Sequence, residues 1–205
     1  MVLQAFTPSP FPPSVQLKYV MNRVNLIHHP ATPQSSVRKI TAIINGGANE
    51  TLEIQYALDG KIDELWIPPT RSAQRKDNLW QHTCFEAFIA APDDSSYIEF
   101  NFSPSGEWAI YTFDTYRSGM TAIDATPPIV TMHGNTNRLQ LNANIEVSSL
   151  PLLTSKSTLR LALAAVIENR HGDFSYWALA HPPGKPDFHH ADSFALTLNP
   201  WKNSE

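Results

Sequence analysis

The chain has 205 residues, 42% of them hydrophobic and 17% charged, which is typical of a globular protein and excludes a largely disordered one. A chain of this length is expected to fold as one domain around a single core. The formal net charge is -4 and the longest basic cluster spans only Arg71 to Lys76, which argues against a nucleic-acid partner.

Cysteine content and hydropathy favour the cytoplasm. The chain has one cysteine, so it forms no internal disulfide and needs no oxidising compartment. No apolar stretch approaches the ~20 residues of a membrane span, and residues 1–15 lack the basic start and unbroken apolar run of a signal peptide. We therefore expect a cytoplasmic protein with no membrane partner.

In chain order, the sequence predicts a proline-rich lead-in over residues 1–14, one β-rich domain over 15–199 and a tail over 200–205. Residues 159–168 are apolar at both parities, which fits a doubly covered strand or a helix, and the turn that follows favours the strand. Short strands are predicted within 15–28 and at 37–44, 52–58, 62–67, 83–91, 97–103, 107–113, 129–133, 138–147, 159–168, 174–180 and 194–198.

Turn signals recur roughly every 8–12 residues between these strands, which is typical of β-sandwiches and barrels. No glycine-rich phosphate loop or strand–helix alternation occurs, which disfavours a nucleotide-binding α/β fold. The sequence therefore predicts an all-β protein, a two-sheet antiparallel sandwich of roughly ten to twelve strands.

Residues 79–120 predict three strands joined by two tight turns, an antiparallel meander. On its middle strand the even positions 98–102 form an apolar stripe, and Tyr97, Glu99 and Asn101 form a polar-aromatic row. On the preceding strand Glu86 has apolar neighbours, and a buried carboxylate needs a partner. Arg117 is the candidate, because a guanidinium binds a carboxylate through two hydrogen bonds.

Two interpretations of this cluster remain open. In one, Glu86 or Glu99 forms a structural ion pair with Arg117. In the other, these groups and Asn101 line a sugar-binding groove, because sugars combine paired hydroxyls with apolar faces that stack on flat rings. The aromatic residues available for such a groove are Trp80, Trp108, Tyr111, Tyr116, Tyr176 and Trp177.

Residues 181–190 (HPPGKPDFHH) form a second polar constellation, a loop made rigid by its prolines. Lys185, Asp187, His189 and His190 are expected to form the rim of a ligand site or to pin the loop to its neighbours. The adjacent histidines would point to opposite faces in an extended chain, and zinc-type spacings are missing. We therefore assign no metal site.

The case for catalysis is weak. No nucleophile or metalloprotease motif is present, and Cys84 lies in mid-strand, where a buried thiol is usually inert. Glu86 and Glu99 would suit a glycosidase at carboxyl separations of roughly 5–9.5 Å. A binding module is favoured over an enzyme, and no catalytic residue is assigned.

Several runs resemble the bacterial DOMON-like domains grouped with family 9 carbohydrate-binding modules: LWQHTCFEAFIA (79–90), YIEFNFSPSGEWAIY (97–111), YRSGM (116–120) and HPPGKPDFHHADSF (181–194). The resemblance extends from about Leu17 to Leu198 and implies an immunoglobulin-like β-sandwich whose relatives bind carbohydrate or haem. The W-x-x-D-x-x-E pattern of the family falls on Trp80, Thr83 and Glu86, so Thr83 replaces an aspartate.

The resemblance also implies ligand contacts. Related modules hold a terminal sugar between tryptophans, a part that Trp80, Trp108 and Trp177 would play. Haem-binding relatives use a methionine and a histidine as axial ligands. Here Met120 or Met132 would pair with His181, His189 or His190, without covalent attachment because no C-x-x-C-H motif is present.

The sequence thus predicts a non-catalytic module for a carbohydrate or sugar-like ligand. A b-type haem electron carrier is the alternative, and a glycoside hydrolase is less favoured. No cofactor is assigned, and the expected partner is a small molecule or a glycan. The predicted ligand-binding residues are Trp80, Glu86, Glu99, Asn101, Trp108, Tyr111, Arg117, Trp177, Lys185, Asp187, His189 and His190.

Overall fold

The computed structural model of the chain describes residues 22–33, 36–46, 51–150 and 158–199. The predicted lead-in over 1–14 and the tail over 200–205 lie outside these residues. The described residues form an all-β fold, as predicted. Its strands are β1 (Asn22–His28), β2 (Val37–Gly46), β3 (Thr51–Gly60), β4 (Cys84–Ala90), β5 (Tyr97–Phe102), β6 (Trp108–Phe113), β7 (Thr121–Ala122), β8 (Ile129–Gly134), β9 (Arg138–Glu146), β10 (Leu159–Glu168), β11 (Phe174–Ala178) and β12 (Leu196–Leu198).

Helix is confined to single 3-10 turns within the described residues. These turns are η1 (Ile62–Glu64), η2 (Leu79–Gln81), η3 (Val147–Ser149) and η4 (Ala191–Ser193). A membrane-spanning helix is accordingly not found in this part of the chain.

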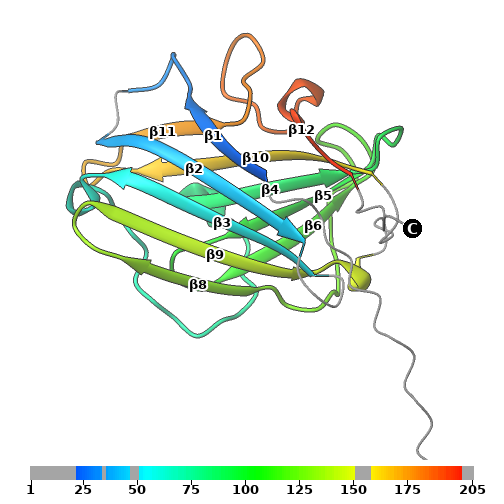
Figure 1. The fold of residues 1–205 in the computed structure, drawn as a ribbon, viewed down its shortest axis with the longest axis horizontal. Coiled ribbons are helices and arrows are strands. Elements are labelled where there is room, and N and C mark those ends of the chain that lie inside the picture. The colour runs from blue at the N-terminus through cyan, green and yellow to red at the C-terminus, as the bar shows by residue number, and fades with distance from the viewer. Residues whose placement is uncertain (1–21, 34–35, 47–50, 151–157, 200–205) are drawn as a thin grey trace, which may run out of the picture.

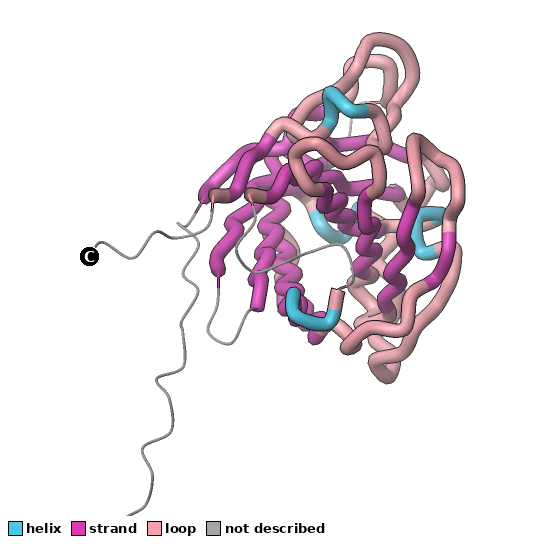
Figure 2. Tube along the Cα trace, turned by 90° about the vertical axis from the view of Figure 1, so that its right-hand side faces the viewer, coloured by secondary structure: helices cyan, strands magenta, loops and turns pink. Residues whose placement is uncertain are grey.

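The twelve strands belong to one antiparallel sheet, ordered β7-β6-β5-β4-β10-β11-β1-β2-β3-β9-β8 with β12 beside β10. Strand β1 joins its halves, because residues 22–26 pair with β2 while Ile27 and His28 pair with β11. The sheet curls, so that β2, β3 and β9 lie in front of β4, β5 and β6 (Figure 1); Figure 2 shows the same curl from the side. Most of the predicted strands are confirmed within the described residues, whereas this continuous hydrogen bonding does not confirm two separate sheets.

The main core lies inside the curl. Successive side chains of a strand point to opposite faces, so each layer contributes alternate residues, among them Tyr56 of β3 and Phe85 and Phe100 of the facing strands. The Tyr56 and Phe85 rings lie 5.0 Å apart. The Tyr56 hydroxyl donates to the carbonyl oxygen of Glu86 at 2.7 Å, which fastens β3 to β4 across the core.

The back layer, β4–β5–β6 with β10 and β11, is also buried on its outer face. Every residue of β4 is buried, and a second apolar cluster on this face includes Phe88, Phe113 and Phe188. Phe188 comes from the loop 181–195, which therefore covers the face. Alanines of β10 and β11 in the same cluster leave room for the loop to pack closely.

The strand predicted at 62–67 is wrong. Residues 62–64 form η1, beside which Lys61 Nζ lies 2.7 Å from Oε1 of Glu64. The chain then runs to Pro68 and Pro69, which lack the N–H that a strand neighbour needs. Pairing is limited to a single bridge from Leu65 to Asn169. Residues 159–168, in contrast, form the predicted strand at the centre of the back layer.

Candidate functional site

A cavity of about 380 Å³ lies on the outer face of the back layer, beside the loop 181–190. Residues of β4, β5, β6, β10 and β11 contribute to it, together with η2 and the segment 114–120. Its volume falls in the range of roughly 300–1,000 Å³ typical of small-molecule sites. The lining residues are Trp80, Glu86, Glu99, Phe113, Arg117, Met120, Val166, Tyr176, Pro186, Phe188 and His189.

Two glutamates reach the cavity from adjacent strands. Glu86 pairs with Asn101, and Phe88 pairs with Glu99, in the β4–β5 register, so the glutamates are diagonal neighbours on one face. Asn101 Nδ2 donates to Oε1 of Glu99 at 2.7 Å, which fixes that carboxyl. Glu86 is only 4% exposed, and its carboxyl forms no hydrogen bond with any other described residue.

These two carboxyls differ in protonation. Burial, followed by the charge of Glu99, raises the pKa of Glu86 well above its ordinary value, against the opposing charge of Arg117. Burial raises the pKa of Glu99 to about 6, while the hydrogen bond from Asn101 and the charge of Arg117 act to lower it. Burial therefore favours the protonated form of Glu86, whereas Glu99, with a pKa of about 6, is mostly a carboxylate at neutral pH.

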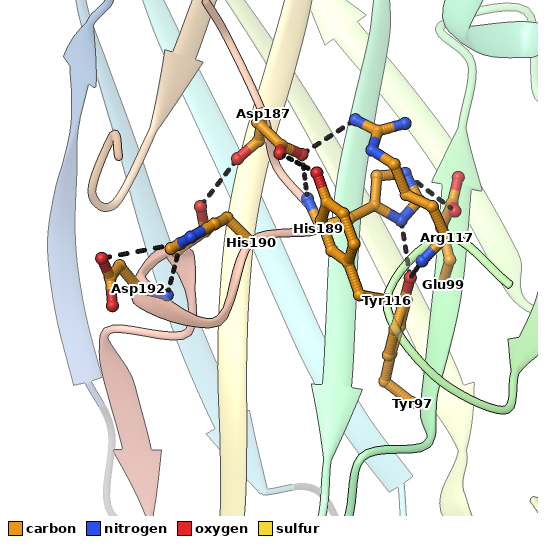
Figure 3. A network of polar contacts seen from close by, with 9 residues as sticks. Tyr97, Glu99, Tyr116, Arg117, Asp187, His189, His190 and Asp192 are labelled. Carbon is orange, nitrogen blue, oxygen red and sulfur yellow. Dashed lines mark hydrogen bonds and ion pairs between the residues drawn. The ribbon is translucent and has the colours of Figure 1, made fainter. Parts of the chain in front are cut away.

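An ion pair joins the loops 114–120 and 181–190 beside the cavity (Figure 3). Arg117 Nη2 donates to Oδ1 of Asp187 at 2.8 Å, and the Tyr116 hydroxyl donates to Oδ2 at 2.5 Å. Burial acts to raise the pKa of Asp187, but the hydrogen bonds from Tyr116 and Arg117 hold it below its ordinary value. Asp187 is therefore ionised at neutral pH and holds the guanidinium in place.

His189 separates this ion pair from the carboxyls. Its Nδ1 lies 2.8 Å from the Tyr97 hydroxyl and its Nε2 lies 3.7 Å from Oε2 of Glu99. Burial and the charge of Arg117 lower the pKa of His189 to about 4. The imidazole is therefore neutral at pH 7, and its contact with Glu99 is a polar contact between a neutral ring and a carboxylate.

Arg117 has a left-handed backbone. Its φ of 52° lies where non-glycine residues are rare and where strain of roughly 1–3 kcal/mol is common. The backbone N–H of Arg117 donates to the Tyr97 hydroxyl at 3.2 Å, and Asp114 N donates to the carbonyl of Ser118 at 3.0 Å. These bonds hold the tight turn that directs the guanidinium toward Asp187.

Trp80 forms an aromatic part of the cavity wall. It belongs to η2, which begins after Asn78. The backbone of Asn78 is left-handed, with a φ of 63°, a conformation that asparagine tolerates. Its ring contacts Tyr111 edge-on with 6.0 Å between centroids. The Tyr111 hydroxyl donates to Oδ1 of Asp77 at 2.5 Å, so the strand β6 supports the position of Trp80.

The cavity brings together part of the predicted ligand set. Trp80, Glu86, Glu99, Arg117 and His189 line it directly. Three further residues support these without lining the cavity: Asn101 bonds Glu99, Tyr111 packs on Trp80, and Asp187 bonds Arg117.

The remaining four predicted residues lie elsewhere. Trp108 and Trp177 point into the main core, because their positions on β6 and β11 have the inward parity. Lys185 is exposed on the loop and is not among the lining residues. His190 lines a neighbouring cavity of about 460 Å³.

Several lining residues were missed by the ligand-site prediction. They are Phe113, Val166, Tyr176, Pro186 and Phe188. Tyr176 precedes Trp177, so the two rings face opposite sides of β11, and the predicted set retained Trp177, which faces inward. Phe113 lies two residues after Tyr111 on β6, so its side chain faces the same side of the sheet, and this spacing could have identified it.

Thr83, the residue at which the sequence resemblance expected an aspartate, has a structural role. Its hydroxyl donates to the carbonyl of Trp66 at 2.7 Å and accepts from the N–H of Glu168 at 3.1 Å. The side chain is fully buried and fastens the segment before β4 to β10. The Thr83 hydroxyl therefore makes its hydrogen bonds within the fold, and Thr83 does not line the cavity.

The methionines and histidines named as possible axial haem ligands are unfavourably placed for that role. Met120 and His189 line the same cavity, but both ring nitrogens of His189 already face polar partners, Tyr97 and Glu99. Met132 lies away on β8, and neither His181 nor His190 lines the cavity with Met120. The described residues therefore do not bring a methionine and a free histidine nitrogen together in this cavity. No group of three or more His, Cys, Asp or Glu side chains in the described ranges could hold a metal ion.

Comparison with known proteins identifies a shared fold and does not identify a function. No protein-family model matches the chain, and no curated protein has significant sequence similarity to it. A Bacteroides uniformis protein, provisionally described as carbohydrate-binding, superposes with a TM-score of 0.60 at 12% identity, over 89% of this chain and 85% of that one. This likeness shows a shared fold.

Two structures of a family 9 carbohydrate-binding module from Caldicellulosiruptor kristjanssonii are more distant. The complex with glucose has a TM-score of 0.49 at 9% identity, covering 86% of this chain and 84% of that one. The complex with cellotriose has a TM-score of 0.45 at 11% identity, covering 86% and 83%. The fold comparison therefore rests on the Bacteroides protein.

Proposed function

We propose that the protein is a non-catalytic carbohydrate-binding module whose site is the cavity between Trp80 and His189. The observation that carries the proposal is the convergence there of an unpaired carboxyl at Glu86, a carboxylate at Glu99 and the guanidinium of Arg117, beside aromatic rings. The shared fold with a protein provisionally described as carbohydrate-binding supports it. Membership of the DOMON-like group and the immunoglobulin-like two-sheet arrangement are further parts of the proposal.

The polar groups complement a sugar hydroxyl pair. When protonated, the form that burial favours, the Glu86 carboxyl donates one hydrogen bond and accepts others; the Glu99 carboxylate only accepts, and Arg117 only donates. Adjacent sugar hydroxyls each donate and accept, so this mixture satisfies both. Trp80 and Tyr176 supply flat apolar surface for the C–H faces of the ring.

Trp80→Ala tests the site, with Trp108→Phe as the matched control. Trp80 lines the cavity, whereas Trp108 lies on the opposite face of the same layer. We expect a glycan array to identify bound sugars for the wild type. Titration calorimetry should then show at least a tenfold loss of affinity for Trp80→Ala, in line with roughly 1–3 kcal/mol for a stacked ring, and no loss for Trp108→Phe. Equal affinities in all three proteins would place the site elsewhere.

One observation favours glycoside hydrolysis as a second candidate. Two carboxyls line one cavity, and burial raises the pKa of Glu86; such a carboxyl beside a carboxylate is the pair that an acid and a base or nucleophile require. An assay with aryl glycosides tests this directly. Turnover that disappears in Glu86→Gln and in Glu99→Gln would establish hydrolysis, and binding without turnover supports the module. An absorbance scan after haem addition, with no Soret band expected, tests the haem alternative.

A further inference from the structure

The charges around the cavity are unbalanced. Glu86 and Glu99 line it with Arg117, but Arg117 already donates to a third carboxylate, Asp187, at 2.8 Å. His189 is neutral at pH 7, because its pKa is about 4. Glu99, Asp187 and Arg117 together leave one net negative charge at neutral pH, and any ionisation of Glu86 adds to it.

Glu86 is the least satisfied group of this set. Its carboxyl is buried, lines the cavity and has no hydrogen bond to any described residue. The carboxyl opens to the cavity, so a ligand there can bond it. A cationic donor binds a carboxylate more strongly than a hydroxyl does, because a charge-assisted hydrogen bond is roughly twice as strong as a neutral one.

The walls of the cavity also suit a cation. Trp80, Phe113, Tyr176 and Phe188 line it, and an ammonium group is attracted to aromatic ring faces. Arg117 is half exposed, at 49%, and stays with Asp187 at the edge. An anionic ligand would meet Glu99 and is disfavoured.

We propose that this cavity selects amino sugars over the corresponding neutral sugars, with the sugar ammonium bound between Glu86 and Glu99. The inference rests on the proposed sugar-binding function and names the substrate class of the same site. Neutral sugars bind through their hydroxyls, and the ammonium group adds a charge-assisted bond to each carboxyl.

Proton release accompanies amino-sugar binding. Burial favours the protonated form of Glu86 in the free protein, and an ammonium beside it favours the carboxylate, so amine binding shifts this group toward release of its proton to solvent. The groups that face this carboxyl include Cys84, Glu99, Arg117 and Tyr176, of which Arg117 alone is cationic at neutral pH. Neutral sugars provide no charge to drive this release.

Matched hexosamine and hexose pairs test the proposal: glucosamine with glucose, galactosamine with galactose, and mannosamine with mannose. The members of each pair differ only by an amine in place of a hydroxyl. Calorimetry at pH 6.5 should show roughly tenfold tighter binding of at least one amine, the gain expected for a bond to a charged group. Repetition in buffers of different ionisation enthalpy should show release of up to one proton for the amine and none for its hexose.

Glu86→Gln should reduce the amine preference and the proton release by more than it reduces hexose affinity, because Glu99 still accepts a hydrogen bond from the ammonium. Glu53→Gln, which removes an exposed carboxylate from β3, is the matched control and should keep both. Hexoses that bind as well as hexosamines, with no proton release, would overturn the inference and leave the proposed function standing. Binding of no sugar from any pair, or from the glycan array, would overturn both.

Discussion

His189 and Glu99 contact each other in the cavity, and burial moves their pKa values in opposite directions. Glu99 rises from an ordinary pKa of 4.5 to about 6, so the folded state holds a proton that the unfolded chain releases, and the contribution of Glu99 to stability falls as pH rises through this window. His189 falls from a pKa of 6.5 to about 4, so its contribution rises with pH between these values. The two effects oppose each other in the wild type.

Single substitutions should separate them. The stability of the wild type relative to His189→Gln should increase from pH 4 to 6.5, by on the order of 3 kcal/mol at about 1.4 kcal/mol per pKa unit. Relative to Glu99→Gln it should decrease from pH 4.5 to 6, by on the order of 2 kcal/mol. Urea denaturation over this pH range measures both. Substitution of the exposed His133 is the control, and slopes of the same sign for both variants would contradict the assignment.

The left-handed backbone of Arg117 gives a second prediction at this scale. Arg117→Ala and Arg117→Gly both remove the guanidinium, so both should weaken sugar binding equally. Only glycine accepts the positive φ without strain, so Arg117→Gly should be more stable than Arg117→Ala by about 1 kcal/mol. Thermal denaturation compares them. A more stable alanine variant would show that the turn relaxes when the side chain is lost.

At the scale of elements, the loops 114–120 and 181–190 behave as one unit because Asp187 binds both Tyr116 and Arg117. This ion pair is partly exposed, so its contribution to global stability is small, roughly 0–1 kcal/mol. Its expected effect is local. It holds Phe188 and His189 against the outer face of β4 and β5.

Asp187→Ala should therefore accelerate amide hydrogen exchange in residues 181–190 and 114–120, with little change in β4 and β5. Sugar affinity should fall several-fold, because the loop wall of the cavity becomes mobile. Asp192→Ala lies in the same loop segment and removes a carboxylate that is 70% exposed, so it is the matched control. Unchanged exchange in Asp187→Ala would show that apolar packing of Phe188 alone holds the loop.

Elements and site differ in how far the sequence predicts them. Alternation and turn residues placed most strands correctly, because both signals are local. The strand at 62–67 failed because a pair of prolines after it removes the pairing N–H groups, and η1 takes its first residues. Site membership depends on which face of a strand meets which loop. Glu86 was found through the cost of burying a carboxylate, Arg117 as its partner and Glu99 through its polar row. Trp177 was retained in the predicted set, but its parity places it inside.

At the scale of the whole molecule, the curl of the sheet packs the inner face of β2, β3 and β9 against β4 and β5, the strands that carry the two glutamates of the cavity. Tyr56 makes this connection, since its hydroxyl donates across the core to the carbonyl of Glu86. Tyr56→Phe should lower the free energy of unfolding by about 1–2 kcal/mol, the usual cost of losing a buried hydrogen bond. Chemical denaturation measures the loss. Because the Glu86 carboxyl points to the opposite side of β4, sugar affinity should change less than twofold.

Burial of the back layer on both faces has a consequence for how specificity can change. Along β4 and along β5, alternate positions face separate surfaces. Phe85 and Phe100 face the core, whereas Glu86 and Glu99 face the cavity. A library that randomises 86 and 99, together with 166 on β10, would therefore vary the ligand surface while leaving the main core intact. The alternation of a β-strand thus lets the same few strands support new binding specificities at little cost to folding.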